Sequence, residues 1–148
     1  PALLASRNDI KSFSKTGQRR DLNREKFKSD NLLSVLKNSE SNANKNLKYL
    51  RKAMDVRSKL KQFHPRSEMG CLSKGRSDIV VIKRGLGSES VFAIHNMTEN
   101  KINYQLNDND LPELIDNNFN MRDFLTTTKY NWKNIRLDPF QVIWLNSL

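Results

Sequence analysis

The sequence predicts an α+β protein with a helical first half and a small antiparallel β-sandwich-like second half. Apolar residues recur at helical spacing in the first half, and they alternate at strand spacing in the second half. Between the two regions, Pro65, Gly70 and Gly75 interrupt both patterns. We therefore expect two domains, one over residues 1–68 and the other over residues 69–148.

The first half is expected to open with a loop and a short helix. Residues 5–22 show no sustained periodicity. Ser29 and Asp30 belong to residue types that cap helix N-termini, and they precede a leucine-rich stretch. We therefore predict a short helix with Leu32, Leu33 and Leu36 on one side.

A longer helix is expected next. Ser39 or Ser41 can start it, and it should end at about Phe63 because the following His64-Pro65 pair stops a helix. Its apolar residues form two stripes about 120° apart. A helix that is apolar on two flanks usually lies between two bodies, and this chain offers only one. The stripes are Ala43, Leu47, Leu50 and Met54, and Ala53, Val56, Leu60 and Phe63.

The sequence pattern of the second half predicts short strands at hairpin spacing, with no crossover helices between them. This arrangement favours a β-sandwich-like module. A turn over residues 85–90 separates the first two strands. In the last strand Phe140, Val142 and Trp144 alternate with their neighbours. Residues 107–118 are expected to form a polar loop, and residues 121–127 a short turn or strand. The expected strands cover residues 78–84, 91–97, 101–106 and 134–145.

The composition sets limits on the class of protein. Hydrophobic residues make up 36% of the 148 residues, below the roughly 45–50% of an ordinary soluble domain. This suggests that part of the structure is missing or belongs to another polypeptide. No apolar run approaches the roughly 18 residues needed to span a bilayer, so no membrane partner is expected. The single cysteine, Cys71, excludes an internal disulfide and favours a cytoplasmic protein.

The net charge of +10 is concentrated in the first half. Residues 1–76 carry 19 Lys and Arg against 7 Asp and Glu, whereas residues 77–148 carry 7 against 9. Such a basic half could bind nucleic acid non-specifically. Against this alternative, the cations are scattered over the exposed helix faces, and the sequence shows no helix-turn-helix, zinc or RNP pattern. Nucleic-acid binding therefore stays the less favoured function.

The sequence alone offers no catalytic or metal site. His64, His95 and Cys71 have no partners at ligand spacing. The stretch Asp108–Asp110 is similar to a calcium loop but lacks its glycine and its bidentate glutamate. Asp9, Asp21 and Asp78 are available as carboxylates, yet nothing singles out two of them as a glycosidic pair. We therefore expect no catalytic residue, no metal and no cofactor in this chain.

Arg20 is the strongest candidate for ligand binding. Its guanidinium stays charged and presents a planar fork of donors suited to hydroxyls, carboxylates or phosphate. Asp21 could pair with Arg24, and Glu25 with a neighbouring cation, which would stiffen the surrounding loop. Spacing alone leaves two interpretations open, a binding residue and a surface charge cluster.

Five segments occur in an order that matches a known family. They are SRND at 6–9, TGQRRDLNREKF at 16–27, FHP at 63–65, VFAIHNMT at 91–98 and LDPFQVIWL at 137–145. Together they resemble the C-terminal end of sucrose phosphorylases and their relatives, the glucosylglycerate and sucrose-6-phosphate phosphorylases of the α-amylase-like glycoside hydrolase family. The TG-x-x-R-x-L/I-N-R pattern is the specific part, and the resemblance covers nearly the whole chain.

The resemblance implies an architecture. The first half would be the helical remnant of the last β/α unit of a TIM-type barrel, followed by a small antiparallel β-sandwich-like C-terminal domain. Residues 30–64 would be the closing helices, and residues 77–148 the terminal domain. The two apolar flanks of the long helix would then face the barrel and the β domain.

The resemblance also implies a chemistry. The family transfers a glucosyl unit to phosphate with retention of configuration, through a covalent glucosyl-carboxylate intermediate. Its nucleophile, acid/base and stabilising carboxylates come from barrel strands that are not in this chain. Of the matching positions, Arg20 would face the glucosyl-binding subsite, Asp9 and Asn23 would support the loop, and Arg19 has no clear equivalent.

Alone, the chain is therefore expected to be inactive. Its expected ligands, once a barrel completes the site, are a glucosyl donor and phosphate. A separately encoded barrel half is a further expected partner, because it could supply the missing part of the site. Three hypotheses follow: a non-catalytic piece of a glucosyl phosphorylase, a subunit of a split enzyme, and the nucleic-acid binder described above.

Overall fold

The computed structural model describes residues 2–23, 26–73, 75–111 and 120–146. The chain forms two compact units, residues 1–55 and residues 56–148. The expected boundary after residue 68 lies inside the second unit, which we call the sheet unit; the first is the helical unit. None of the described helices is long and apolar enough to span a membrane.

The helical unit begins with two short helices where the sequence predicted a loop. A 3-10 turn, η1 (Ala2–Leu4), precedes α1 (Ile10–Thr16) and α2 (Arg19–Leu22). The loop prediction over residues 5–22 was wrong because neither helix is long enough to show a periodic apolar stripe. The ends of α1 are instead fixed by the Asp9 side chain and by Gly17.

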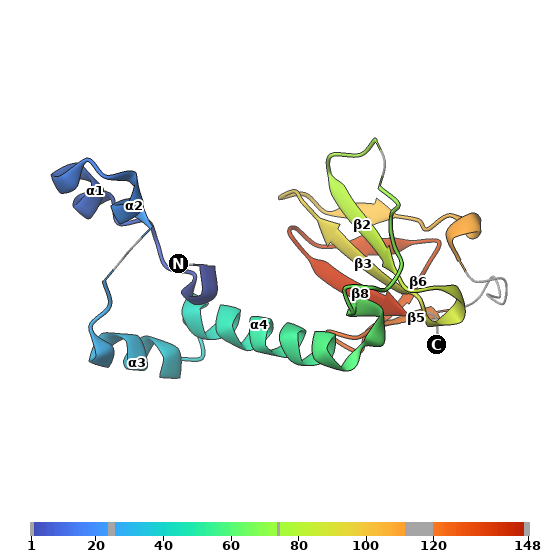
Figure 1. Ribbon diagram of the computed structural model, residues 1–148, viewed down its shortest axis with the longest axis horizontal. Helices are drawn as coiled ribbons and strands as arrows, with labels where there is room; N and C mark the ends of the chain where they lie inside the picture. Colours follow the sequence, from blue (N-terminus) through green and yellow to red (C-terminus); the bar gives the residue numbers. More distant parts are fainter. Residues whose placement is uncertain (1, 24–25, 74, 112–119, 147–148) are drawn as a thin grey trace. The chain divides into compact units, whose positions relative to one another are not determined.

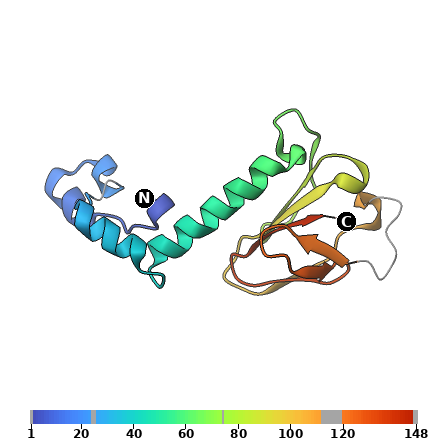
Figure 2. The same ribbon diagram turned by 90° about the horizontal axis from the view of Figure 1, so that it is seen from below.

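Two further helices follow at the predicted places, with different ends. Helix α3 (Ser29–Lys37) has Lys28 at its N-cap with no side-chain cap, so the prediction that Ser29 or Asp30 caps this helix was wrong. Ser41 does cap α4 (Asn42–Lys59), because its Oγ accepts the Asn44 N–H at 3.1 Å. Figure 2 shows α4 as one continuous helix. It ends at Lys59, four residues before the expected end, and a 3-10 turn, η2 (Lys61–Phe63), follows.

The helical unit has almost no interior. Among its described residues, Ala43 is the one buried hydrophobic side chain. Large apolar side chains on each of its longer elements stay exposed, for example Ile10 at 65%, Leu33 at 55% and Met54 at 68%. The residues of the two predicted stripes are half-buried, except for buried Ala43 and exposed Met54.

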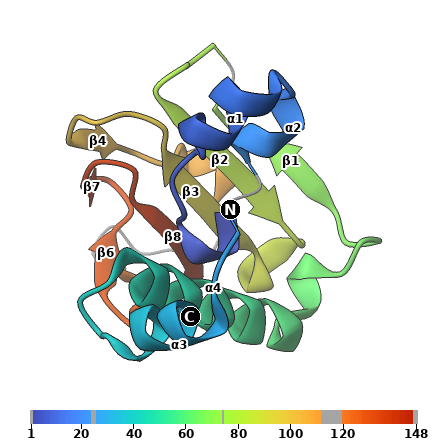
Figure 3. The same ribbon diagram turned by 90° about the vertical axis from the view of Figure 1, so that its left-hand side faces the viewer.

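The sheet unit is antiparallel, as predicted. Its larger sheet has the strand order β1-β2-β3-β8-β5-β6, and β4 pairs with β7 in a second sheet (Figures 1 and 3). Two 3-10 turns, η3 (Gly87–Glu89) and η4 (Asp108–Asp110), lie in its connections. The strands are β1 (Met69–Cys71), β2 (Ile79–Arg84), β3 (Val91–Asn96), β4 (Ile102–Tyr104), β5 (Asn120–Asp123), β6 (Lys129–Asn131), β7 (Ile135–Leu137) and β8 (Val142–Asn146).

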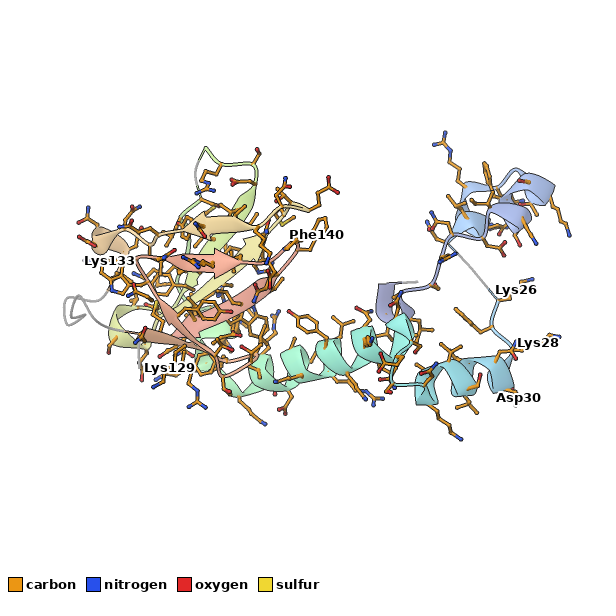
Figure 4. All side chains as sticks on the ribbon, turned by 180° about the vertical axis from the view of Figure 1, so that it is seen from behind. Lys26, Lys28, Asp30, Lys129, Lys133 and Phe140 are labelled. Carbon is orange, nitrogen blue, oxygen red and sulfur yellow. The ribbon has the colours of Figure 1, made fainter. Side chains whose placement is uncertain are left out.

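The predicted strands and the observed strands differ in two places. The edge strands β1 and β6 were missed because each has three residues and little apolar character. The expected strand over residues 134–145 is two strands, β7 and β8, separated by a turn. Phe140 lies in that turn at φ 53° with 66% of its surface exposed, and it projects from the sheet unit (Figure 4). The buried face of β8 carries Ile143 and Leu145, whereas Val142 and Trp144 are half-buried.

Both sheets contribute to one hydrophobic core, which supports the sandwich-like description. Strand β3 is buried on both faces from Val91 to Ile94, which explains its imperfect alternation in the sequence. On the edge strand β6, Lys129 (Figure 4) places charge where a bare strand edge would invite pairing with another chain. The core residues are Ile79, Val81, Phe92, Ile94, Tyr104, Leu106, Met121, Trp132, Ile135, Leu137, Ile143 and Leu145.

Buried Asn96 fixes the turn that follows β3. Its amide Nδ2 donates to the carbonyls of Asn100 and Asp138 at 2.6 and 2.9 Å. Its Oδ1 accepts both the N–H and the hydroxyl of Thr98 at 2.9 Å. This side chain thus satisfies the backbone of two loops that come from distant parts of the sequence.

His95 makes the stability of the sheet unit sensitive to pH. It lies on β3 in register with Val80 on β2 and Val142 on β8, and burial lowers its pKa below the usual 6.5. The unfolded chain therefore binds the proton more tightly than the folded chain. The stability that neutral His95 provides is complete above pH 6.5 and is lost as the pH falls to the lowered pKa.

We expect the Tm of the sheet unit to fall as the pH decreases from 6.5 to about 5, and His95→Leu to reduce this fall. His64→Leu changes an exposed histidine and provides the control. Thermal unfolding followed by circular dichroism measures the effect. An equally steep fall in His95→Leu would contradict the assignment.

Candidate functional site

The α1–α2 hairpin carries the arginine that the sequence singled out. Asp9 caps α1: its carboxylate accepts the Ser12 N–H at 3.0 Å and the Ser12 hydroxyl at 2.6 Å. These bonds, the hydroxyl bond foremost, hold the pKa of Asp9 below its usual 3.8. The Asp9 N–H donates to the Leu22 carbonyl at 2.7 Å. Asp9 therefore closes the hairpin at both its helix start and its far end, the supporting role expected for it.

The turn between the two helices is fixed by its own residues. Gly17 ends α1 in the left-handed conformation at φ 65°, which glycine adopts without steric cost, and its N–H donates to the Phe13 carbonyl. The Thr16 hydroxyl donates to the Asp21 carboxylate at 2.6 Å. Asp21 is thus held within the hairpin, whereas its expected partner Arg24 and the neighbouring Glu25 lie outside the described residues.

Arg19 and Arg20 form the first turn of α2, and both side chains are exposed. The hairpin beneath them is held by the Thr16–Asp21 and Asp9–Leu22 hydrogen bonds. An exposed guanidinium on a fixed turn can bind hydroxyls or carboxylates through two parallel N–H groups. The hairpin can therefore present a cation for binding.

The helical unit also has an open hollow of about 520 Å³ with mainly apolar walls. The Ser6 hydroxyl is buried here without a hydrogen-bond partner. Lys26 and Lys28 line the hollow as part of the chain segment that leads into α3, and their side chains project to one side of that segment (Figure 4). The apolar lining residues are Leu4, Ala5, Phe27, Leu32, Val35 and Ala43.

The other candidates from the sequence do not form a site. Among the described residues, no three His, Cys, Asp or Glu side chains gather as a metal site would require. His64 Nδ1 accepts the Arg66 N–H, and the Cys71 sulfur lies 3.6 Å from the Ser73 hydroxyl. Each of these groups is therefore engaged by a close neighbour in the sequence.

Each of the three candidate carboxylates accepts a hydrogen bond from a residue near it in the sequence. Asp9 caps α1 and Asp21 accepts from Thr16, while Asp78 accepts from Arg76 Nε at 2.8 Å. The hydrogen bond from Arg76 holds the pKa of Asp78 below its usual value. Each of these three carboxylates is therefore held by a residue close to it in the sequence.

The acidic stretch Asp108–Asp110 forms η4 beside an open polar hollow of about 530 Å³. The Asp110 carbonyl accepts Lys83 Nζ at 2.7 Å. A backbone carbonyl bound to an ammonium group fits a solvated loop better than a cation site.

Sequence reasoning missed three polar residues that organise the sheet unit. Asp123 is fully buried and receives hydrogen bonds across strands, and Arg84 and Gln62 join the segment after α4 to the sheet. The Asp-x-Leu-Thr sequence at residue 123 is a turn signal that could have identified the first. The partners of Arg84 lie about twenty residues away, so no local signal identifies it.

Comparison with known proteins shows a likeness of fold. No protein-family profile and no curated protein matches the chain. Among solved structures it is similar to AmyP bound to maltotriose (TM-score 0.58, 16% identity, 71% of this chain and 21% of that one). It is also similar to an Anoxybacillus alpha-amylase, with a TM-score of 0.55 and 18% identity over 75% of this chain and 24% of that one. A third similar structure is the trehalulose synthase MutB from Pseudomonas mesoacidophila, with a TM-score of 0.58 and 11% identity over 78% of this chain and 19% of that one.

These structures are α-amylase-family glycoside hydrolases. The chain spans about a fifth to a quarter of their length. At identities of 11% to 18%, the similarity establishes a shared fold over most of this chain.

Proposed function

We propose that the chain is the C-terminal part of a sucrose-phosphorylase-like retaining glucosyl phosphorylase, which transfers a glucosyl unit from sucrose or a glucosylglycerate-type donor to phosphate. The proposal rests on a combination of two observations. The fold is shared with α-amylase-family enzymes of which the chain spans about a quarter or less. The TGQRRDLN stretch at residues 16–23, which resembles the phosphorylase pattern, lies at the capped α1–α2 hairpin.

The unfilled helical unit supports the view that further polypeptide completes the protein. Its described residues bury one hydrophobic side chain, Ala43, and leave an apolar hollow open. Helices that end a TIM-type barrel would bury these surfaces against the preceding strands and helices. Since barrel enzymes build their site from the ends of several strands, this chain alone lacks the catalytic carboxylates.

In this proposal Arg20 is the substrate-binding residue. Its guanidinium would hold sugar hydroxyls and orient the neighbouring carboxylates supplied by the barrel. The Asp9 and Asp21 hydrogen bonds would keep the α2 turn in place while the ligand binds. Arg19, the adjacent cation on the same turn, has no assigned role and provides a matched control.

We expect the purified chain to release no glucose 1-phosphate from sucrose or glucosylglycerate in phosphate buffer. We also expect a fusion of the chain to the barrel part of a sucrose phosphorylase to be active. In that fusion, Arg20→Lys should lower kcat/KM roughly a hundredfold, because lysine cannot form the two-pronged contact. Arg19→Lys should change it by less than about threefold. Coupled detection of glucose 1-phosphate provides the measurement.

Turnover by the chain alone would refute the incomplete-site proposal. Equal losses in the two arginine variants of an active fusion would remove the assignment of Arg20. Salt-dependent binding of duplex DNA, together with an inactive fusion, would favour the nucleic-acid alternative.

A further inference from the structure

The segment that follows α4 is held to the strands of the sheet unit by several hydrogen bonds. We call residues 60–68 the strap. Two of its carbonyls accept from one side chain on β2: Arg84 Nε donates to the Gln62 carbonyl at 3.0 Å, and Arg84 Nη2 donates to the His64 carbonyl at 2.6 Å. The Glu68 carbonyl accepts the Gly85 N–H at 2.9 Å. The end of β2 thus holds the strap at three backbone positions.

The strap also inserts a side chain into the sheet unit. Gln62 is buried, and its Nε2 donates to the Glu89 carbonyl at 2.8 Å. Lys61 pairs with the Glu89 carboxylate at 2.6 Å. Gly85 has φ 82°, and a Cβ there would lie 2.9 Å from Gln62 Cγ. The glycine therefore leaves the space that Gln62 occupies.

An aromatic contact continues the strap onto β8. The Phe63 ring lies 4.7 Å from the Trp144 ring, centroid to centroid, and the planes are tilted by 45°. The guanidinium of Arg57, on the last turn of α4, lies 5.9 Å from the Phe63 centroid. A chain of contacts therefore runs from α4 through Phe63 to the middle of the large sheet.

We infer that the strap is a clamp that fixes the last turn of α4 to the strands of the same unit, with Arg84 as its positioning residue. Arg84 can serve two carbonyls at once because its donors diverge in a rigid plane, which a lysine ammonium cannot reproduce. The aromatic contact and Gln62 then set the strap against the sheet. Anchoring the end of α4 is thus a role of the sheet unit, and the clamp acts in this way whichever reaction the protein serves.

Hydrogen exchange of Arg84→Lys in the full chain tests the clamp. We expect the amides of residues 57–66 to exchange at least about tenfold faster, because a charge-assisted hydrogen bond is lost, while the amides of β3 and β8 keep their protection. Phe63→Leu keeps the apolar volume and should have the same local effect. Arg122→Lys alters an exposed arginine on β5 and provides the matched control.

The indole N–H signals of the two tryptophans give a second measurement. The Trp144 signal should shift in both strap variants, and the Trp132 signal, from the core, should stay in place. Unchanged exchange over residues 57–66 would overturn the clamp. Acceleration spread equally over all strands, or reproduced by Arg122→Lys, would also overturn it by showing a general loss of stability.

Discussion

Replacing Asp123 with alanine is expected to lower the free energy of unfolding of the sheet unit by about 3–5 kcal/mol. The side chain is fully buried on β5. Its Oδ1 accepts the N–H groups of Leu125 and Trp144 at 3.1 and 2.8 Å, and its Oδ2 accepts the N–H and the hydroxyl of Thr126 at 3.0 and 2.6 Å. Alanine would leave these four donors without their acceptor; the Leu125 N–H is buried, whereas Thr126 is exposed to water.

Urea unfolding followed by tryptophan fluorescence measures this loss. Asp123→Asn should fall between the wild type and alanine, because one carbonyl oxygen can still accept two of the four donors. The control is Asp138→Ala: this side chain is 68% exposed and pairs with Lys101 at 3.1 Å. An exposed pair of this kind contributes less than about 1 kcal/mol. Equal losses in Asp123→Ala and Asp138→Ala would show that buried acceptors do not organise the β5–β6 turn.

In hydrogen exchange, the helical unit is expected to lose protection long before the sheet unit. Helices α1, α2 and α3 have 7, 4 and 9 residues, and isolated helices shorter than about 12–15 residues are marginal in water. Their described residues bury little apolar surface, whereas the sheet unit contains twelve clustered core residues. Protection should therefore differ by at least about 2 kcal/mol between residues 10–55 and the central strands β3 and β8.

Exchange of the purified chain, read by mass spectrometry after pepsin digestion, measures this difference. Addition of a barrel part that completes the fold should raise the protection of residues 10–55 and leave β3 and β8 unchanged. Equal protection of the two units in the chain alone would mean that the helical unit has a sufficient core of its own. The incomplete barrel would then lose its physical basis.

The strands that the sequence predicted well are those with strong local signals. Residues 79–84, 91–96 and 102–104 are bounded by turn residues and rich in β-branched or aromatic side chains, so local pattern and final fold agree. The three-residue edge strands lacked such signals. Phe140 looked like a strand residue because the alternation continued through Asp138-Pro139, but the turn there interrupts the strand.

The α1–α2 hairpin shows the other kind of limit. The sequence singled out Arg20 through a motif and gave Asp9 a role in supporting the loop, since residue identity alone carries that information. It did not predict the two helices, because their ends depend on Asp9 reaching Leu22 and on Thr16 reaching Asp21. The assignment of Arg20 to a sugar subsite stays a prediction.

By itself, then, the sequence determined the order of a helical and an antiparallel region, most strand positions and the arginine with binding potential. Those features follow from local periodicity and from the chemistry of single side chains. Only the tertiary structure decided which apolar stripes are buried, that β8 inserts between β3 and β5, and that Arg84 holds the strap. The physical reason is that burial and hydrogen bonding between distant segments depend on how the whole chain folds. Local periodicity does not indicate which distant residues will come into contact.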